Sequence, residues 1–98
     1  MLFTARFTDK PGCAALRAEH LAAHVRWLGE HADTILAAGT LRDTADAVPL
    51  GGLWLLQADS KEAIHALIET DPFTLCGLRQ QVEVLHWHRA FPEGKVTL

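Results

Sequence analysis

Residues 2–12 have the sequence LFTARFTDKPG, and they decide how the fold begins. Apolar and polar residues alternate along the first part, which places Phe3, Ala5 and Phe7 on one side. This period-two pattern is typical of a strand with one buried face. Asp9-Lys10-Pro11-Gly12 then supplies residues that favour a turn. The chain is therefore predicted to start as a strand that turns sharply into its next element.

A helix and a hairpin of two strands are predicted to follow this turn. Residues 14–31 contain no proline and carry Leu21, Val25 and Leu28 at helical spacing, which predicts a long amphipathic helix with these residues on its buried side. Short apolar runs at 34–41 and 51–58 predict two strands, which the polar connection between them joins as a hairpin.

The second half repeats the order of helix and strand. Asp59 or Ser60 can cap a second helix, which ends before Asp71-Pro72. Pro72 suits the first turn of a new short helix over 72–76, for which Asp71 is a good N-cap and Gly77 a stop. Alternation over 80–90 predicts the last strand, and residues 90–98 are expected to be a frayed tail.

The predicted order is strand, helix, strand, strand, helix, strand. This βαββαβ order gives an α+β, ferredoxin-like fold in which a four-stranded antiparallel sheet carries both helices on one face. Ninety-eight residues are enough for a single domain, 1–98. The run Leu53-Trp54-Leu55-Leu56 presents apolar groups to both sides of the sheet, and no third long helix remains to cover the second side. We therefore expect a homodimer that packs sheet against sheet.

Composition narrows the class of partner. The net charge of −3, without a basic run, argues against nucleic acid and anionic membranes as partners and favours a small-molecule ligand. No apolar run reaches the ~20 residues of a membrane span, and residues 1–6 lack a basic leader with a long apolar stretch, so we expect a cytoplasmic protein. Cys13 and Cys76 are too far apart for a CxxC motif and are expected to be reduced thiols.

An ordered set of motifs resembles a known family. The set consists of DKPG at 9–12, Arg17, His24, ILAAGTL at 35–41, Gly51-Gly52 and DPFTLCGL at 71–78. Together these are similar to the YciI-like (YCII-related) family over about residues 1–90. The resemblance implies the dimeric α+β barrel fold. It also implies that His24 and Asp71 act together at a pocket.

The chain departs from this family pattern at two positions. Many relatives have an arginine where this chain has Leu21, and many have a proline where it has Thr40. The departure at Leu21 leaves Arg17 as the candidate for anion binding. A purely structural interpretation also exists for both members of the dyad. A histidine at the edge of a helix's apolar face is often only packed, and Asp71 could be no more than a helix cap.

Two other constellations compete for a function. Histidines 20, 24 and 31 share a helix face, and with His86 or His88 they could bind zinc or copper, but no Cys or carboxylate stands at a matching interval, so we predict no metal. A set of aromatic and imidazole groups could line a pocket for a flat organic ligand, or belong to the core or a dimer interface: Trp27, Trp54, Trp87, His86 and His88.

Gly39 marks either a bulge or a close approach to the backbone. The candidate ligand contacts are this glycine together with the residues named above: Arg17, Gly39, Trp54 and His86.

The predicted chemistry is proton transfer. An imidazole can take up and return a proton, and a carboxylate hydrogen-bonded to its other nitrogen fixes the tautomer. For this, His24 would act as general base or acid and Asp71 as its orienting partner, without a cofactor. The resemblance implies lyase-type elimination or isomerisation of small organic molecules, including aromatic or halogenated ones. The alternative is a non-catalytic small-molecule-binding or accessory module.

Overall fold

The computed structural model describes residues 1–92 and has the predicted order of elements. The strands are β1 (Leu2–Asp9), β2 (Ile35–Leu41), β3 (Gly51–Gln57) and β4 (Arg79–His86). The helices are α1 (Ala14–Glu30), α2 (Lys61–Ile68) and the short α3 (Pro72–Leu75). All neighbouring strands are antiparallel, in the order β2-β3-β1-β4. This is the predicted ferredoxin-like α+β fold.

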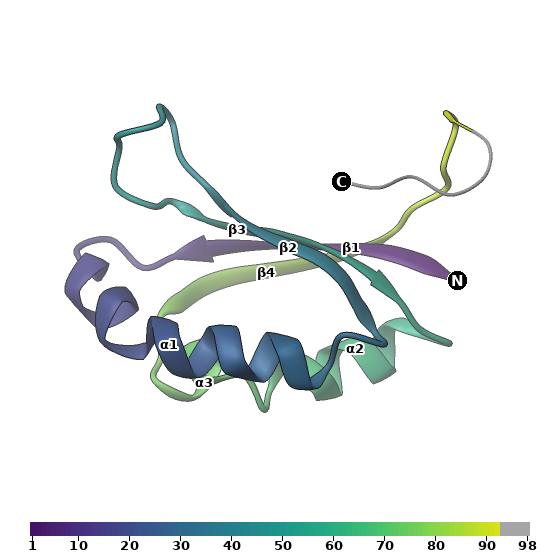
Figure 1. Cartoon of the computed structure of the whole chain (residues 1–98), viewed down its shortest axis with the longest axis horizontal. Coiled ribbons are helices and arrows are strands. Elements are labelled where there is room, and N and C mark those ends of the chain that lie inside the picture. Colours follow the sequence, from purple (N-terminus) through teal and green to yellow (C-terminus); the bar gives the residue numbers. More distant parts are fainter. Residues whose placement is uncertain (93–98) are drawn as a thin grey trace.

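The helices lie on one side of the sheet, and of residues 1–92 only the connection at 42–50 and the segment that follows β4 rise on the other side (Figure 1). Alternation along β1 places Phe3, Ala5 and Phe7 under the helices, where they are buried. Their partners on β3 include Trp54 and Leu56, which are also buried. The core therefore lies between the sheet and the helices.

Two caps begin the helices of the second half as the sequence predicts. The Ser60 side chain accepts a hydrogen bond from the Ala63 amide, and the Asp71 side chain accepts one from the Phe73 amide. Gly77 has a φ of +79°, which a residue with a Cβ rarely adopts, and it ends the turn after α3. Together these features set the direction in which the chain enters β4.

The last strand is shorter than predicted. It ends at His86, which pairs with Phe3, because β1 has only Leu2 beyond this point and the Trp87 amide donates to the Leu2 carbonyl. Residues 87–92 therefore have no neighbouring strand to pair with, and Trp87 is partly exposed. Of the predicted frayed tail, residues 93–98 lie outside the described residues.

The prediction that Leu21 and Val25 lie on the buried side of α1 is wrong, whereas Leu28 packs against the core as predicted. Leu21 and Val25 are 44% and 56% exposed, whereas the buried residues of α1 are Arg17, His24 and Trp27. The spacing of hydrophobic residues predicts the buried side of a helix only if its polar side chains lie in water. In α1, Arg17 and His24 are buried because they pair with buried groups of the protein.

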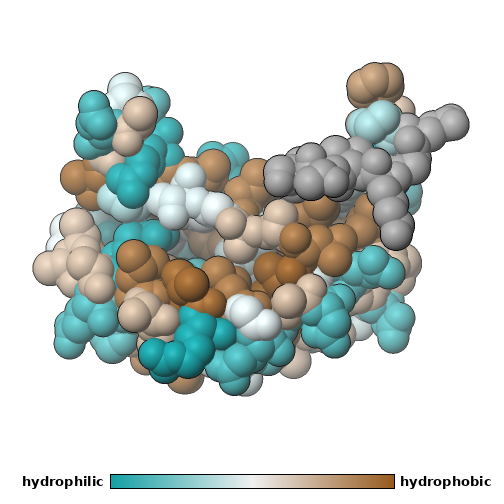
Figure 2. All heavy atoms as spheres, in the orientation of Figure 1, coloured by the Kyte–Doolittle hydropathy of each residue, from teal (hydrophilic) through white to brown (hydrophobic). Residues whose placement is uncertain are grey.

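Hydrophobic side chains form a band on the surface along α1 and the sheet above it (Figure 2). No helix within residues 1–92 has both the length and the apolar character needed to cross a membrane.

Gly51 offers a test of the sheet register. A Cβ at this position would overlap the backbone carbonyl of Phe7, on the neighbouring strand. We expect Gly51→Ala to lower the free energy of unfolding by about 3 kcal/mol, since overpacking against backbone cannot be relieved by a rotamer change. Urea denaturation measures this difference.

The matched control is Gly29→Ala in α1, where an added Cβ meets nothing within 4 Å. This variant should be more stable than the parent by roughly 0.5–1 kcal/mol, because alanine favours helix. Equal stability of the two variants would contradict the described contact between β1 and β3.

Candidate active site

His24 and Asp71 are in direct contact, although 47 positions separate them in the sequence. His24 projects from the buried side of α1, and its Nδ1 lies 2.8 Å from Oδ1 of Asp71 at the start of α3. The same Oδ1 accepts the hydrogen bond from the Phe73 amide, at 3.0 Å. Asp71 is therefore both the helix cap and the partner of the histidine, which the sequence presented as alternatives.

Asp71 is ionised in this environment. Burial raises the pKa of its carboxyl, but the His24 hydrogen bond, the Arg79 charge and the Phe73 amide act against burial and hold the pKa below its ordinary value. An ionised carboxylate can only accept hydrogen bonds, so Nδ1 of His24 must be the donor. In the neutral imidazole the proton is therefore on Nδ1, and Nε2 keeps its lone pair.

Arg79 is a site residue that the sequence analysis missed. Its Nη2 lies 2.7 Å from Oδ2 of Asp71, in the geometry of an ion pair and not of an aligned hydrogen bond. Its Nη1 donates to Oγ1 of Thr74 at 2.7 Å, and its Cζ lies 3.9 Å from the centre of the Phe7 ring. Burial lowers the pKa of Arg79 and Asp71 raises it, and a guanidinium in a protein stays charged. The signal that could have identified it is the need of a buried aspartate for a cation.

Aromatic rings fix the orientation of His24. Its imidazole stacks on the Phe73 ring, with centroids 3.9 Å apart and planes inclined by 14°. The rings of Trp27 and Trp54 lie near it, at 6.5 Å and 6.1 Å. Trp27 is itself held by a hydrogen bond from its Nε1 to Oγ1 of Thr70. The ring can therefore not turn freely, and its Nδ1 stays directed at the carboxylate.

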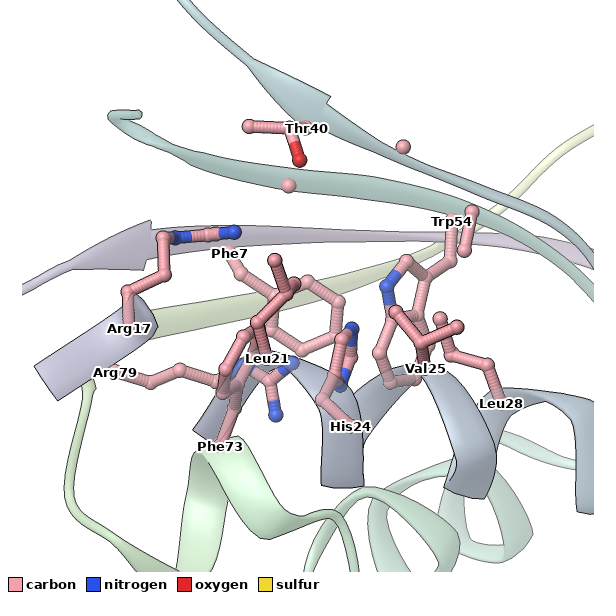
Figure 3. A pocket seen from close by; sticks show the side chains of 13 residues that line it. Phe7, Arg17, Leu21, His24, Val25, Leu28, Thr40, Trp54, Phe73 and Arg79 are labelled. Carbon is pink, nitrogen blue, oxygen red and sulfur yellow. The ribbon is translucent and has the colours of Figure 1, made fainter. Parts of the chain in front are cut away.

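Arg17 reaches the same cavity from two helical turns before His24 in α1. Its Nε donates to Oδ2 of Asp9 at 2.7 Å, and its Nη2 donates to the Gly51 carbonyl at 3.2 Å. These contacts hold the guanidinium between α1 and the sheet (Figure 3). Within residues 1–92, Nη1 of Arg17 makes no hydrogen bond, so it can donate to a bound molecule.

These groups line a cavity of about 130 Å³ between α1 and the sheet. Its inner end holds the polar groups of Arg17, His24 and Arg79, while Leu21 and Val25 of α1 stand at its open side (Figure 3). Phe7, Trp54 and Phe73 add aromatic walls, and the edge strand β2 closes the remaining side. Polar groups thus lie deep in the cavity and apolar groups near solvent.

The structure brings together most of the candidate residues. Arg17, Gly39 and Trp54 line the cavity with His24, and Asp71 lies behind the histidine without lining it. His86 is not among the lining residues, because its ring packs on Phe3, with centroids 4.5 Å apart. The irregularity in β2 lies between Ile35 and Ala37 and not at Gly39.

No group of three or more His, Cys, Asp or Glu side chains within the described part of the chain could hold a metal ion. Of the histidines of the first helix, His24 points inward to Asp71 and Nδ1 of His31 contacts the Trp27 carbonyl.

A second hollow, of about 510 Å³, lies beside the 42–50 connection and the turn before α1. Its described lining includes Lys10, Cys13 and Pro49 but no histidine. It therefore lacks a group that could transfer a proton as readily as His24 near neutral pH. The smaller cavity is the better candidate for chemistry.

Comparison with known proteins agrees with this fold. The family model of the YCII-related domain matches residues 1–88. Among solved structures, the chain is similar to 5-chloro-2-hydroxyhydroquinone dehydrochlorinase (TftG) from Burkholderia phenoliruptrix AC1100, in complex with 2,5-dihydroxybenzoquinone. The two sequences are 30% identical, the TM-score is 0.82, and the match covers 92% of this chain and 96% of that chain.

More distant structures share the fold alone. SnoaB, a cofactor-independent oxygenase from Streptomyces nogalater, is 14% identical with a TM-score of 0.57, over 94% of this chain and 96% of that chain. Rv0793 from Mycobacterium tuberculosis is 20% identical with a TM-score of 0.53, over 92% and 97%. No curated protein matches the sequence. The match over residues 1–88 shows that this chain belongs to the YCII-related domain family.

Proposed function

We propose that this protein is a small-molecule enzyme in which His24 transfers a proton and Asp71 orients it. The observation that carries the proposal is the 2.8 Å contact between Nδ1 and a fully buried carboxylate, at the wall of an open cavity. This contact leaves Nε2 as the nitrogen that can serve a substrate. A histidine that only packed in the core would need neither the charged partner nor the cavity.

The reaction class that fits is elimination or isomerisation. In an elimination, Nε2 of His24 would accept a proton from the substrate, and the electron pair left behind would form a new π bond. The leaving group would depart with its own bonding pair, and Asp71 would stabilise the imidazolium that forms. An isomerisation would use the same nitrogen, which would return the proton to another atom. The 30% identity with a protein named as a dehydrochlorinase supports this class.

The substrate that fits the cavity is a single flat ring that bears oxygen atoms. A volume of about 130 Å³ is comparable to that of cavities of about 150 Å³ that take up benzene. Trp54 and Phe73 are aromatic parts of the cavity lining, and Nη1 of Arg17 offers a donor to a phenolate or carbonyl oxygen. TftG, the relative at 30% identity, was solved with 2,5-dihydroxybenzoquinone, a molecule of this kind.

We propose a homodimer that buries the side of the sheet on which no helix of residues 1–92 lies. On this side Thr4 of β1 pairs with Leu55 of β3 and Leu85 of β4, and in the next row Arg6 pairs with Leu53. Leu53 and Leu85 are 45% and 48% exposed. Leucines at the centre of an uncovered sheet favour burial against a second sheet.

Chloride release from 5-chloro-2-hydroxyhydroquinone tests the activity. We expect His24→Ala and Asp71→Asn to lower kcat/KM by roughly 10²–10⁴-fold, because each removes part of the proton-transfer pair. His20→Ala, one turn earlier in α1, is the control and should match the parent. A parent protein that binds 2,5-dihydroxybenzoquinone but releases no chloride would favour the binding module over this enzyme.

The charge of Asp71 can be tested through stability. Because its pKa in the folded protein lies below the ordinary 3.8, its ionised form stabilises the fold above that pH, and this stabilisation is lost as the pH falls through the folded pKa. We expect Asp71→Asn to cost roughly 3–5 kcal/mol at neutral pH, where it leaves Arg79 buried without its partner. Below the ordinary pKa the difference between parent and variant should shrink.

Urea unfolding at a series of pH values measures this dependence. Asp33→Asn removes an exposed carboxylate and is the control, which should follow the parent at every pH. A constant difference between Asp71→Asn and the parent across the acid range would mean that Asp71 is not ionised in the folded protein.

Sedimentation velocity tests the assembly. We expect the parent to sediment as a dimer and Leu53→Lys or Leu85→Lys to sediment as a monomer, since a lysine at either position would place a charge in the interface. Leu75→Lys is the control, because Leu75 is 73% exposed on α3, on the opposite side of the sheet. A monomeric parent, or variants that dimerise like it, would contradict the proposed interface.

A further inference from the structure

Arg79 joins three parts of the site at one guanidinium group. It is the first residue of β4, and its Nη2 lies 2.7 Å from Oδ2 of Asp71. Its Nη1 donates a hydrogen bond to Thr74 of α3, and its cation lies over the Phe7 ring on β1. Only 7% of its side chain is exposed. A long, flexible side chain is thus held in a single position next to the carboxylate.

The two oxygens of Asp71 differ in their contacts. Oδ1 receives two N–H groups, from His24 and from the Phe73 amide. Among the described residues, Oδ2 has Arg79 as its close charged partner and no aligned hydrogen-bond donor. Asp71 is completely buried, so water does not replace a lost partner. The ionised state of this carboxylate therefore depends on Arg79.

Loss of that cation would change what Asp71 offers to His24. A buried carboxylate without a compensating cation takes up a proton, because burial penalises the charged form. A protonated carboxyl has an O–H group that can donate to Nδ1 of His24. The imidazole proton would then move to Nε2, the nitrogen that faces the substrate. A ring in this tautomer cannot accept a proton from a substrate at Nε2.

We infer that Arg79 is a positioning residue that, through Asp71, keeps the imidazole proton of His24 on Nδ1 and leaves Nε2 free to act as a base. The inference rests on the proposed function only for its catalytic consequence, since the position of the proton is a property of the protein without substrate.

The other charges nearby do not replace Arg79. The charged and titratable groups that act directly on Asp71 are His24 from α1 and Arg79 from β4. Arg17 from α1 and Asp9 from β1 come next, and they pair with each other at 2.7 Å. Arg17 thus already has a carboxylate partner of its own. It provides a matched control, because it is an arginine of similar burial in the same cavity that does not contact Asp71.

Long-range ¹H–¹⁵N spectra of the labelled full chain report which ring nitrogen of His24 carries the proton. At about pH 8, above the ordinary titration range of histidine, we expect the parent to show a protonated Nδ1. In Arg79→Met the protonated signal should move to Nε2, and the carboxyl ¹³C signal of Asp71 should shift to that of a protonated acid. Arg79→Lys keeps the charge and should retain the parent pattern, as should Arg17→Met.

A folded Arg79→Met protein with the parent pattern, or with protons on both ring nitrogens of His24, would overturn the inference. An Arg17→Met protein that changes like Arg79→Met would overturn it as well. If Arg79→Met does not fold, Arg79→Gln carries the test with the same expected shift, because its amide can still donate to Oδ2 but carries no charge.

The result is separable from that of the activity test. If the proton moves to Nε2 in Arg79→Met but the parent protein shows no turnover, the role of Arg79 is supported and the proposed enzyme is contradicted. If the parent turns over substrate but the proton stays on Nδ1 in Arg79→Met, the enzyme is supported and the role of Arg79 is contradicted.

Discussion

Burial of the Asp71 carboxylate is the constraint on which the site depends. A carboxylate away from water costs several kcal/mol unless charges and hydrogen bonds compensate it. The compensation comes from three elements: His24 on α1, the Phe73 amide in α3 and Arg79 on β4. The contacts of Asp71 with His24 and Arg79 join the start of α3 to α1 and to β4, whereas the contact with the Phe73 amide is local. The geometry of the site and the packing of the helices therefore depend on the same contacts.

The balance of charge follows from this arrangement. Two arginines, Arg17 and Arg79, face two aspartates, Asp9 and Asp71, so the fixed charges around the cavity sum to zero. His24 is then the group at the cavity whose charge can change in the course of a reaction. An imidazolium formed there gains the attraction of Asp71, while Arg79 limits that attraction. Such a site suits proton transfer that must run in both directions.

The order of the elements could be predicted because it depends on local features. Alternation in β1, the caps at Ser60 and Asp71 and the glycine after α3 act within a few residues of sequence. The pairing of His24 with Asp71 needed the family resemblance, since 47 positions separate them. The sequence indicates that a buried aspartate needs a cation, but it does not indicate that Arg79 is this cation, because their contact forms only when β4 pairs with β1.

The inverted polarity of α1 has the same origin and bears on how a ligand binds. Arg17 and His24 face inward because they bind the carboxylates of Asp9 and Asp71. As a result, Leu21 and Val25 lie at the open side of the cavity. A ring that carries oxygen at one end would meet apolar side chains first and lose water from its faces, while its oxygen reached the polar interior. Entry in the opposite sense would bury the ring against charged groups and leave the oxygen beside leucine and valine. If the substrate is the proposed oxygen-bearing ring, the cavity favours one orientation, which would bring the oxygenated end of the ring to Arg17 and His24.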